Sequence, residues 1–389
     1  MPLSTAAFEF ATATRIRFGA GVRHELPDAA ATMGRRALVV TGSAANRAAE
    51  LTEALTGSGI AVVPLVVAAE PTVAMIREGT AHAREAGCDL VIAIGGGSVQ
   101  DAGKALAAML AHSGDPMDYL EIIGRGQPLT EHSLPMIAVP TTAGTGSEVT
   151  RNAVLASPEH RVKASLRSAT MLPRLAVVDP ELTLSLPPKL TASTGLDALT
   201  QLIEPYVSVR ANPMTDLFCV EGMTRAGRSL PRAWGGGSDV EARTEMAWAS
   251  LLGGLALANA GLGAVHGFAA PLGGMFPIPH GVACAAVLPY AMEANVRALR
   301  RRAPASDRLR RYSDVARILT GLPSAAPEVG VEWVAQLCAT LEVPPLRVYG
   351  VGHEAIPALV EAAARSGSMK GNPIALETAE LEELIAQAI

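Results

Sequence analysis

The first half of the chain alternates short apolar runs with segments whose apolar residues recur at helical spacing. We expect strands at the apolar runs, which cover residues 37–42, 60–66, 89–94 and 135–140. Residues 50–59 and 71–87 have the pattern of helices that end near a glycine. Continuous apolar strands separated by helices are typical of a parallel sheet covered on both faces.

The pattern changes near residue 182, beyond which helical spacing continues to Ile389 without a further series of strands. Proline and glycine mark the turns of this second part. The sequence therefore predicts an α/β domain over residues 1–183 and an all-α domain over residues 184–389. The length of 389 residues agrees with two domains, since one hydrophobic core seldom exceeds about 300 residues.

Composition narrows the class of protein. The chain is 49% hydrophobic and 18% charged, with a net charge of −5, so it is too apolar for a disordered protein. The acidic balance argues against nucleic acid or an anionic membrane as a partner. The arginine-rich segment 296–317 has only Tyr312 as an aromatic residue, so we interpret it as a solvated helical surface.

The expected compartment is the cytoplasm. The first 21 residues lack the basic and apolar regions of a secretory signal. The uncharged segment 248–265 contains several glycines and Asn259, which favours a close-packed core helix over a membrane span. Four widely spaced cysteines, at positions 88, 219, 284 and 338, form no CxxC motif, so we expect free thiols in a reducing environment.

A glycine loop follows the strand expected at 89–94. Residues 95–97 are all glycine, and Ser98 is expected to cap the next helix with Asp101 as its capping-box partner. Glycines let a ligand approach the backbone, and free amides at a helix start attract phosphate. A plain tight turn is the alternative, because GGGS recurs at 235–238 without a preceding strand, and neither G-x-G-x-x-G nor a P-loop is present.

A second polar loop, residues 140–152, also follows an apolar strand. It carries the hydroxyl groups of Thr141, Thr142, Thr145 and Ser147 among two glycines. Ligands bind parallel sheets at the carboxyl ends of the strands, so two such loops predict a binding site there. A hydroxyl-rich surface turn remains the alternative.

Polar residues interrupt apolar segments in the second half. Asp197 and Gln201 are four residues apart and share one face of a helix. His266 and His280 flank an apolar segment. A carboxylate with imidazoles suits Zn²⁺ or Fe²⁺, whereas hydrogen-bonded core histidines would need no metal.

These motifs, in this order, resemble the iron-containing (group III) alcohol dehydrogenase family. The resemblance rests on GGGSVQDAGKA at 95–105, PTTAGTGSEVT at 140–150, GLDALTQLIEPYVS at 195–208 and HGFAAPLGGMFPIPHG at 266–281. It extends more weakly over nearly the whole chain. It implies the dehydroquinate synthase-like architecture, a Rossmann-like N-terminal domain followed by a helical C-terminal domain. It also implies NAD or NADP and a divalent metal, iron or zinc, as cofactors, and a homodimer.

The resemblance also places site residues. The metal ligands and catalytic residues would be Asp197, His266 and His280, with Gln201 at the fourth ligand position. The residues placed at the cofactor are Gly42, Gly96, Gly97, Ser98, Asp101, Thr141, Thr142, Thr145, Asn152 and Lys163. Pro205 lacks an N–H and so cannot bond to the carbonyl group of Gln201.

Three positions depart from the family pattern. Gln201 stands where the family has histidine, and its carbonyl oxygen is a weaker donor than imidazole. Ala270 stands where members carry a histidine that is held to relay the alcohol proton or to pack on the nicotinamide. Gly42 stands where NAD-selective members place aspartate, and Arg47 follows nearby, so NADP(H) is expected to be accepted.

The expected function is therefore hydride transfer between NAD(P) and an alcohol, aldehyde or ketone, with a metal polarising the oxygen. The substrate would be a small uncharged molecule. A metal-independent reductase that resembles the maleylacetate reductases, or a degenerate cofactor-binding protein, would use the same fold. A sugar-phosphate cyclase would need a cluster of basic residues that this sequence does not show.

Overall fold

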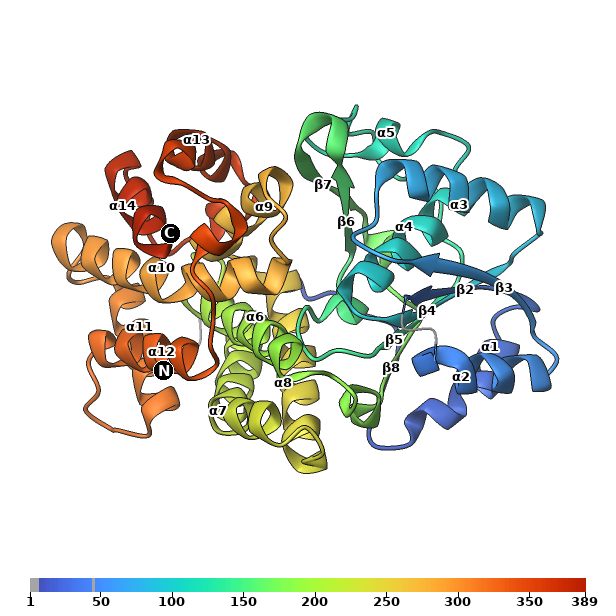
Figure 1. Ribbon diagram of the computed structural model, residues 1–389, viewed down its shortest axis with the longest axis horizontal. Coiled ribbons are helices and arrows are strands. Elements are labelled where there is room, and N and C mark those ends of the chain that lie inside the picture. The colour runs from blue at the N-terminus through green and yellow to red at the C-terminus, as the bar shows by residue number, and fades with distance from the viewer. Residues whose placement is uncertain (1–6, 44–45) are drawn as a thin grey trace. The chain divides into compact units, whose positions relative to one another are not determined.

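The computed structural model describes residues 7–43 and 46–389, and it falls into two compact units. The first unit contains residues 11–142 and 146–185. The second contains residues 186–389, together with residues 143–145 and the described residues before Ala11. Figure 1 follows the chain from one unit into the other.

The first unit is built on a six-stranded parallel sheet with the strand order β1-β8-β5-β4-β2-β3. Its strands are β1 (Ile16–Phe18), β2 (Arg36–Gly42), β3 (Ala61–Val67), β4 (Leu90–Gly95), β5 (Met136–Pro140) and β8 (Leu175–Val178). Every residue of β4 and β5 is buried. Side chains on both faces of the sheet are therefore buried, which explains why its central strands are continuous apolar runs.

Successive residues of β2 face opposite sides of this sheet. Leu38 and Val40 belong to a hydrophobic cluster with α3 and α4, whereas Ala37 and Val39 belong to a second cluster with α1 and α2. The helices of this unit are α1 (Leu26–Ala31), α2 (Asn46–Gly57), α3 (Val73–Glu85), α4 (Gly97–Ala111) and α5 (Pro116–Tyr119). Figure 1 shows α1 and α2 on one face of the sheet and α3 and α4 on the other.

An antiparallel hairpin supplements the parallel sheet. Strands β6 (Asn152–Ser157) and β7 (Val162–Arg167) pair over their full lengths as a separate two-stranded sheet. The hairpin, β1 and β8 extend the strand content beyond the four strands expected from the sequence.

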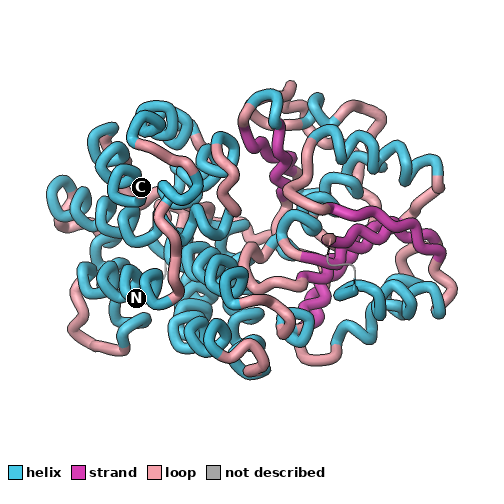
Figure 2. The backbone as a smooth tube through the Cα atoms, in the orientation of Figure 1, coloured by secondary structure: helices cyan, strands magenta, loops and turns pink. Residues whose placement is uncertain are grey.

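The second unit is helical, with no strand among its described residues (Figure 2). Its helices are α6 (Pro188–Val207), α7 (Pro213–Gly235), α8 (Val240–Ala260), α9 (Ala264–Met275), α10 (His280–Arg302), α11 (Asp307–Thr320), α12 (Pro327–Thr340), α13 (Ile356–Arg365) and α14 (Thr378–Ala388). The expected fold class, an α/β domain followed by an all-α domain, is confirmed.

The expected capping of α4 is wrong. Helix α4 begins at Gly97, its N-cap is Gly96 and not the expected Ser98, and no described side chain caps it. The carboxylate of Asp101 instead accepts hydrogen bonds from the hydroxyl of Ser147 (2.6 Å) and the amide of Val154 (2.9 Å). The buried ammonium group of Lys104 lies 3.2 Å from the same carboxylate and donates to Ser147. Asp101 therefore makes tertiary contacts with the second polar loop and with β6 instead of the expected capping contact with Ser98.

In the part of the chain that the structure describes, no single helix is both long and apolar enough to cross a membrane. One pair of helices, α8 and α9, meets the length and composition criteria when taken together, but the two are bent by 99° relative to each other.

The arginine-rich segment 296–317 is lined by carboxylates. Arg297 pairs with Glu383 at 2.7 Å, and Arg300 pairs with Glu328 at 2.6 Å. These ion pairs offset the positive charge of the segment.

Candidate functional site

Helix α6 supplies the first two side chains of a polar cluster in the helical unit. Asp197 and Gln201 lie four residues apart on it, with 1% and 2% of their surfaces exposed. Asp197 Oδ1 and Gln201 Oε1 are both buried, and neither has a hydrogen-bond partner in the described part of the chain. A buried oxygen without a hydrogen bond is costly unless a cation or another donor satisfies it.

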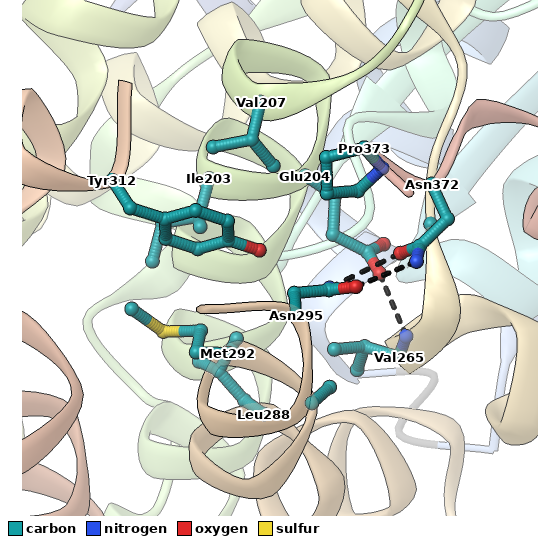
Figure 3. A pocket seen from close by; sticks show the side chains of 12 residues that line it. Ile203, Glu204, Val207, Val265, Leu288, Met292, Asn295, Tyr312, Asn372 and Pro373 are labelled. Carbon is teal, nitrogen blue, oxygen red and sulfur yellow. Dashed lines mark hydrogen bonds between the residues drawn. The ribbon is translucent and has the colours of Figure 1, made fainter. Parts of the chain in front are cut away.

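Helix α9 positions His266, and groups from elsewhere in the chain cap this helix. Gly263, its N-cap residue, has no side chain to offer. The amide of Ala264 donates to Asn372 Oδ1 at 3.0 Å, and the amide of Val265 donates to Glu204 Oε1 at 2.7 Å. Figure 3 shows Glu204 and Asn372 side by side, with the dashed line from Glu204 to Val265. The start of α9 is therefore fixed by residues that precede and follow it.

Glu204 also orients the imidazole of His266. Its second oxygen lies 2.6 Å from His266 Nδ1, so that nitrogen donates its proton to the carboxylate. The lone pair is then on Nε2, which lies 3.3 Å from Asp197 Oδ1. Carboxylate, histidine and metal are commonly linked in this order, because the carboxylate fixes the tautomer that can bind the metal.

Helix α10 begins with the second histidine. His280 Nε2 lies 3.8 Å from Asp197 Oδ1, and the two imidazole rings have centroids 5.4 Å apart. Cys284 follows one helical turn later and is fully buried. Its Sγ lies 3.7 Å from Nε2 of each histidine. Asp197, His266, His280 and Cys284 thus place four potential ligand atoms within 4.8 Å of one another.

The pKa values in this cluster reflect a concentration of acidic groups. Burial would raise the pKa of Asp197, but His280 and His266 lower it below its ordinary value. Burial would lower the pKa of His280, but Cys284 and Asp197 raise it to about 9. The pKa of His266 is likewise raised, against the effect of burial, by Cys284 and Glu204. The raised pKa values of the two histidines favour positive charge on the imidazoles, and the lowered pKa of Asp197 favours its negative carboxylate beside them.

The structure thus brings Asp197, His266 and His280 together and places Gln201 on the same face of α6 as Asp197. Sequence reasoning missed Cys284 and Glu204. Each had a signal: Cys284 is four residues after His280, and Glu204 is seven residues after Asp197, so each shares a helix face with an expected ligand.

In the α/β unit, Gly96, Gly97 and Ser98 form the junction between β4 and α4. Because no described side chain caps α4, the first amides of the helix are available to an anion. A Cβ on Gly96 would lie 3.1 Å from Thr142, so the two polar loops touch here. The amide of Thr141, which is buried, donates to the carbonyl of Gly95 at 3.1 Å.

The remaining residues expected at the cofactor are more dispersed. Lys163 forms an ion pair with Glu70 at 2.6 Å, and Asn152 begins strand β6. Thr145 groups with the helical unit. Gly42 ends strand β2, and the side chain of Arg47 lies outside the described part of the chain.

Comparison with known proteins identifies the family. Residues 13–180 match the model of the iron-containing alcohol dehydrogenases, and residues 191–389 match the C-terminal model of the Fe-containing alcohol dehydrogenase family. A 1,3-propanediol dehydrogenase from Citrobacter freundii is 36% identical over 367 residues, which cover 91% of this chain and 92% of the relative.

Solved structures agree with this match. A 1,3-propanediol oxidoreductase superimposes with a TM-score of 0.91 at 34% identity, covering 99% of this chain and 100% of the other. A sulfoacetaldehyde reductase from Bifidobacterium kashiwanohense, solved in complex with NAD⁺, gives a TM-score of 0.84 at 30% identity and covers 98% of both chains. The chain belongs to the iron-containing alcohol dehydrogenase family, and it is an oxidoreductase that interconverts alcohols and aldehydes.

Proposed function

We propose that this chain is a metal-assisted, NAD(P)-dependent alcohol dehydrogenase that also reduces aldehydes or ketones. The observation that carries the proposal is the buried Asp197 Oδ1, which has no hydrogen bond and faces two imidazole nitrogens at 3.3 and 3.8 Å. Water cannot reach this oxygen, so a cation is the partner that suits it. In a reductase that works without a metal, the protons of the two imidazoles would have to satisfy this oxygen.

Asp197, His266 and His280 would hold the metal, with Gln201 expected at the fourth position. When bound, the metal would act as a Lewis acid that polarises the oxygen of the carbonyl or alcohol. Glu204 keeps His266 in the tautomer that offers Nε2. The other imidazole, His280, is partly exposed at the start of α10 and can contact a small substrate.

NAD(P) would bind the glycine loop of the α/β unit and supply or accept the hydride. Gly96, Gly97 and the uncapped start of α4 offer amides to the diphosphate. Gly42 carries no carboxylate that would repel a 2′-phosphate, so we expect NADPH as well as NADH to be accepted.

The alcohol proton needs a route that does not use a relay histidine. Ala270, on helix α9, has only a methyl group at the position where the family carries that imidazole. Water or the hydroxyl groups of the cofactor ribose would carry the proton instead. The homodimer and the cytoplasmic location stay predictions from the sequence.

The test compares Asp197→Asn with the wild type after purification without chelator. The carboxamide has the size of the carboxylate but no charge, so both metal content and turnover should fall. Turnover should drop at least about 100-fold, since Lewis-acid stabilisation is worth several kcal/mol. Elemental analysis measures the metal, and NADH and NADPH oxidation with a panel of aldehydes and ketones measures turnover.

Asp314→Asn on α11 is the matched control, because that aspartate is about one-fifth exposed and pairs with arginines rather than histidines. It should keep the metal and the activity. Full activity of Asp197→Asn, or of wild-type protein shown to be free of metal, would remove the metal mechanism.

A further inference from the structure

Cys284 has an unusual environment for a buried thiol. Its surface is entirely inaccessible, and its Sγ is 3.7 Å from Nε2 of both His266 and His280. Cys338 shows the ordinary case, in which a buried thiol donates to a backbone carbonyl, here that of Ala285 at 3.6 Å. The sulfur of Cys284 instead faces two nitrogens and a carboxylate.

Four of the six separations among these atoms match the edges of a tetrahedron around one metal ion, and all six are within 4.8 Å. Typical bonds of about 2.0 Å to nitrogen or oxygen and about 2.3 Å to sulfur give edges of roughly 3.3 Å between nitrogen and oxygen and roughly 3.6 Å between sulfur and nitrogen. The observed nitrogen–oxygen separations are 3.3 and 3.8 Å, and both sulfur–nitrogen separations are 3.7 Å. Small shifts of the side chains would bring all four atoms to one ion.

The charges also match a divalent cation. A carboxylate from Asp197 and a thiolate from Cys284, with two neutral imidazoles, carry a total charge of −2. Cys284 lies in the second turn of the 23-residue helix α10, near its positive N-terminal end. The thiolate is the form of cysteine that binds metals.

We propose that Cys284 is a metal ligand, completing a four-donor site with Asp197, His266 and His280 in place of the expected Gln201. This inference rests on the metal role in the proposed function. A thiolate is a soft donor, so the site should prefer Zn²⁺ to Mg²⁺ or Mn²⁺. A fifth position, which zinc can add during catalysis, remains for the substrate. The free Oε1 of Gln201 is then an acceptor for a hydroxyl group or water.

X-ray absorption at the zinc edge of the wild-type holoenzyme tests the ligand directly. All four cysteines lie in the described part of the chain, and only Cys284 belongs to the cluster. One sulfur scatterer at about 2.3 Å is therefore expected in addition to nitrogen and oxygen. A first shell of nitrogen and oxygen alone would overturn the inference while leaving the proposed function standing.

Cobalt substitution tests independently, and in variants, whether Cys284 binds the metal. Protein stripped by chelator and reloaded with Co²⁺ should show an intense near-ultraviolet band from sulfur-to-cobalt charge transfer. Cys284→Ser should lose the band, and its Zn²⁺ affinity should fall more than about 100-fold, because even outer partners of a ligand cost 10- to 100-fold. Cys338→Ser, the matched control at another buried thiol, should keep both.

The outcomes separate the two proposals. A band that persists in Cys284→Ser, or its absence from cobalt-loaded wild type, overturns the role of Cys284 only. Wild-type protein that binds neither Zn²⁺ nor Co²⁺ overturns both the inference and the metal role. If Cys284→Ser fails to fold, as thermal unfolding would show, the absorption spectrum of the wild type still decides.

Discussion

Glu148 has a carboxyl group that the fold removes from water. It lies in the 3₁₀ helix Ser147–Val149 and is 3% exposed. Burial raises its pKa to about 7, although a backbone hydrogen bond and the charge of Lys104 act in the opposite direction. The folded protein therefore holds this proton more tightly than the unfolded chain, so the stability contribution of this group falls as the pH rises from about 4.5 to about 7.

Replacing Glu148 by Gln should remove that loss. Between pH 5 and pH 8 the unfolding free energy of the wild type should fall by up to about 3 kcal/mol more than that of Glu148→Gln. The reason is that raising a pKa by one pH unit corresponds to about 1.4 kcal/mol. Urea unfolding at both pH values measures the difference, and Glu159→Gln at an exposed position is the control. A difference between Glu148→Gln and wild type that stays constant with pH would contradict the raised pKa.

At the scale of single residues, the sequence was most informative where a polar residue interrupts an apolar segment. Asp197, His266 and His280 stood out for that reason, and the structure places them together. Cys284 did not stand out, because a thiol in an apolar helix is ordinary; its spacing from His280 was readable, but only the fold brings it to His266. The partner of Asp101 was mistaken for the same reason, since Ser147 is distant in sequence.

At the scale of helices, Gly281 controls how closely α10 approaches α6. A Cβ at this position would lie 2.6 Å from the carbonyl oxygen of Ser193 and 2.9 Å from its carbonyl carbon. These are backbone atoms of α6 and cannot rotate away. Gly281 follows His280 directly, so the same close approach brings His280 toward Asp197 on α6.

Gly281→Ala should therefore push α10 away from α6. We expect a loss of about 1–3 kcal/mol in unfolding free energy from overpacking, together with weaker zinc binding as His280 moves. Gly227→Ala on α7 is the control, because its Cβ would lie 3.5 Å from the nearest atom, in Leu319, and could gain up to about 1 kcal/mol from helix propensity. Unchanged stability and zinc affinity in Gly281→Ala would show that the two helices can separate without cost.

Among the elements, the buried parallel strands were predictable and the hairpin was missed. Strands β2, β4 and β5 are apolar runs because helices cover both faces of the sheet. Strands β6 and β7 alternate buried and partly buried residues over much of their length around a turn that begins at Pro158. In β7 the sequence VKASLR alternates apolar and polar residues, so this strand was readable, whereas NAVLAS in β6 shows no such alternation.

At the scale of the whole molecule, the candidate metal donors come from three helices that are separate in the sequence. Asp197 lies on α6, His266 on α9, and His280 and Cys284 lie on α10. A metal ion bound by all four would cross-link these helices in the folded chain but not in the unfolded one. Its binding free energy therefore adds to the stability of the helical unit.

Zinc should accordingly stabilise the helical unit selectively. At a free concentration of about 100 times Kd, it should add about 2.7 kcal/mol to the unfolding free energy. Hydrogen–deuterium exchange with and without zinc should show slower exchange in α6, α9 and α10, and much smaller changes in the parallel sheet, whose residues supply none of the four donors. Cys284→Ser should show less protection at the same zinc concentration. Protection spread evenly over both units, or absent from α10, would mean that zinc does not bind through these helices, because a local cross-link protects the elements that it joins.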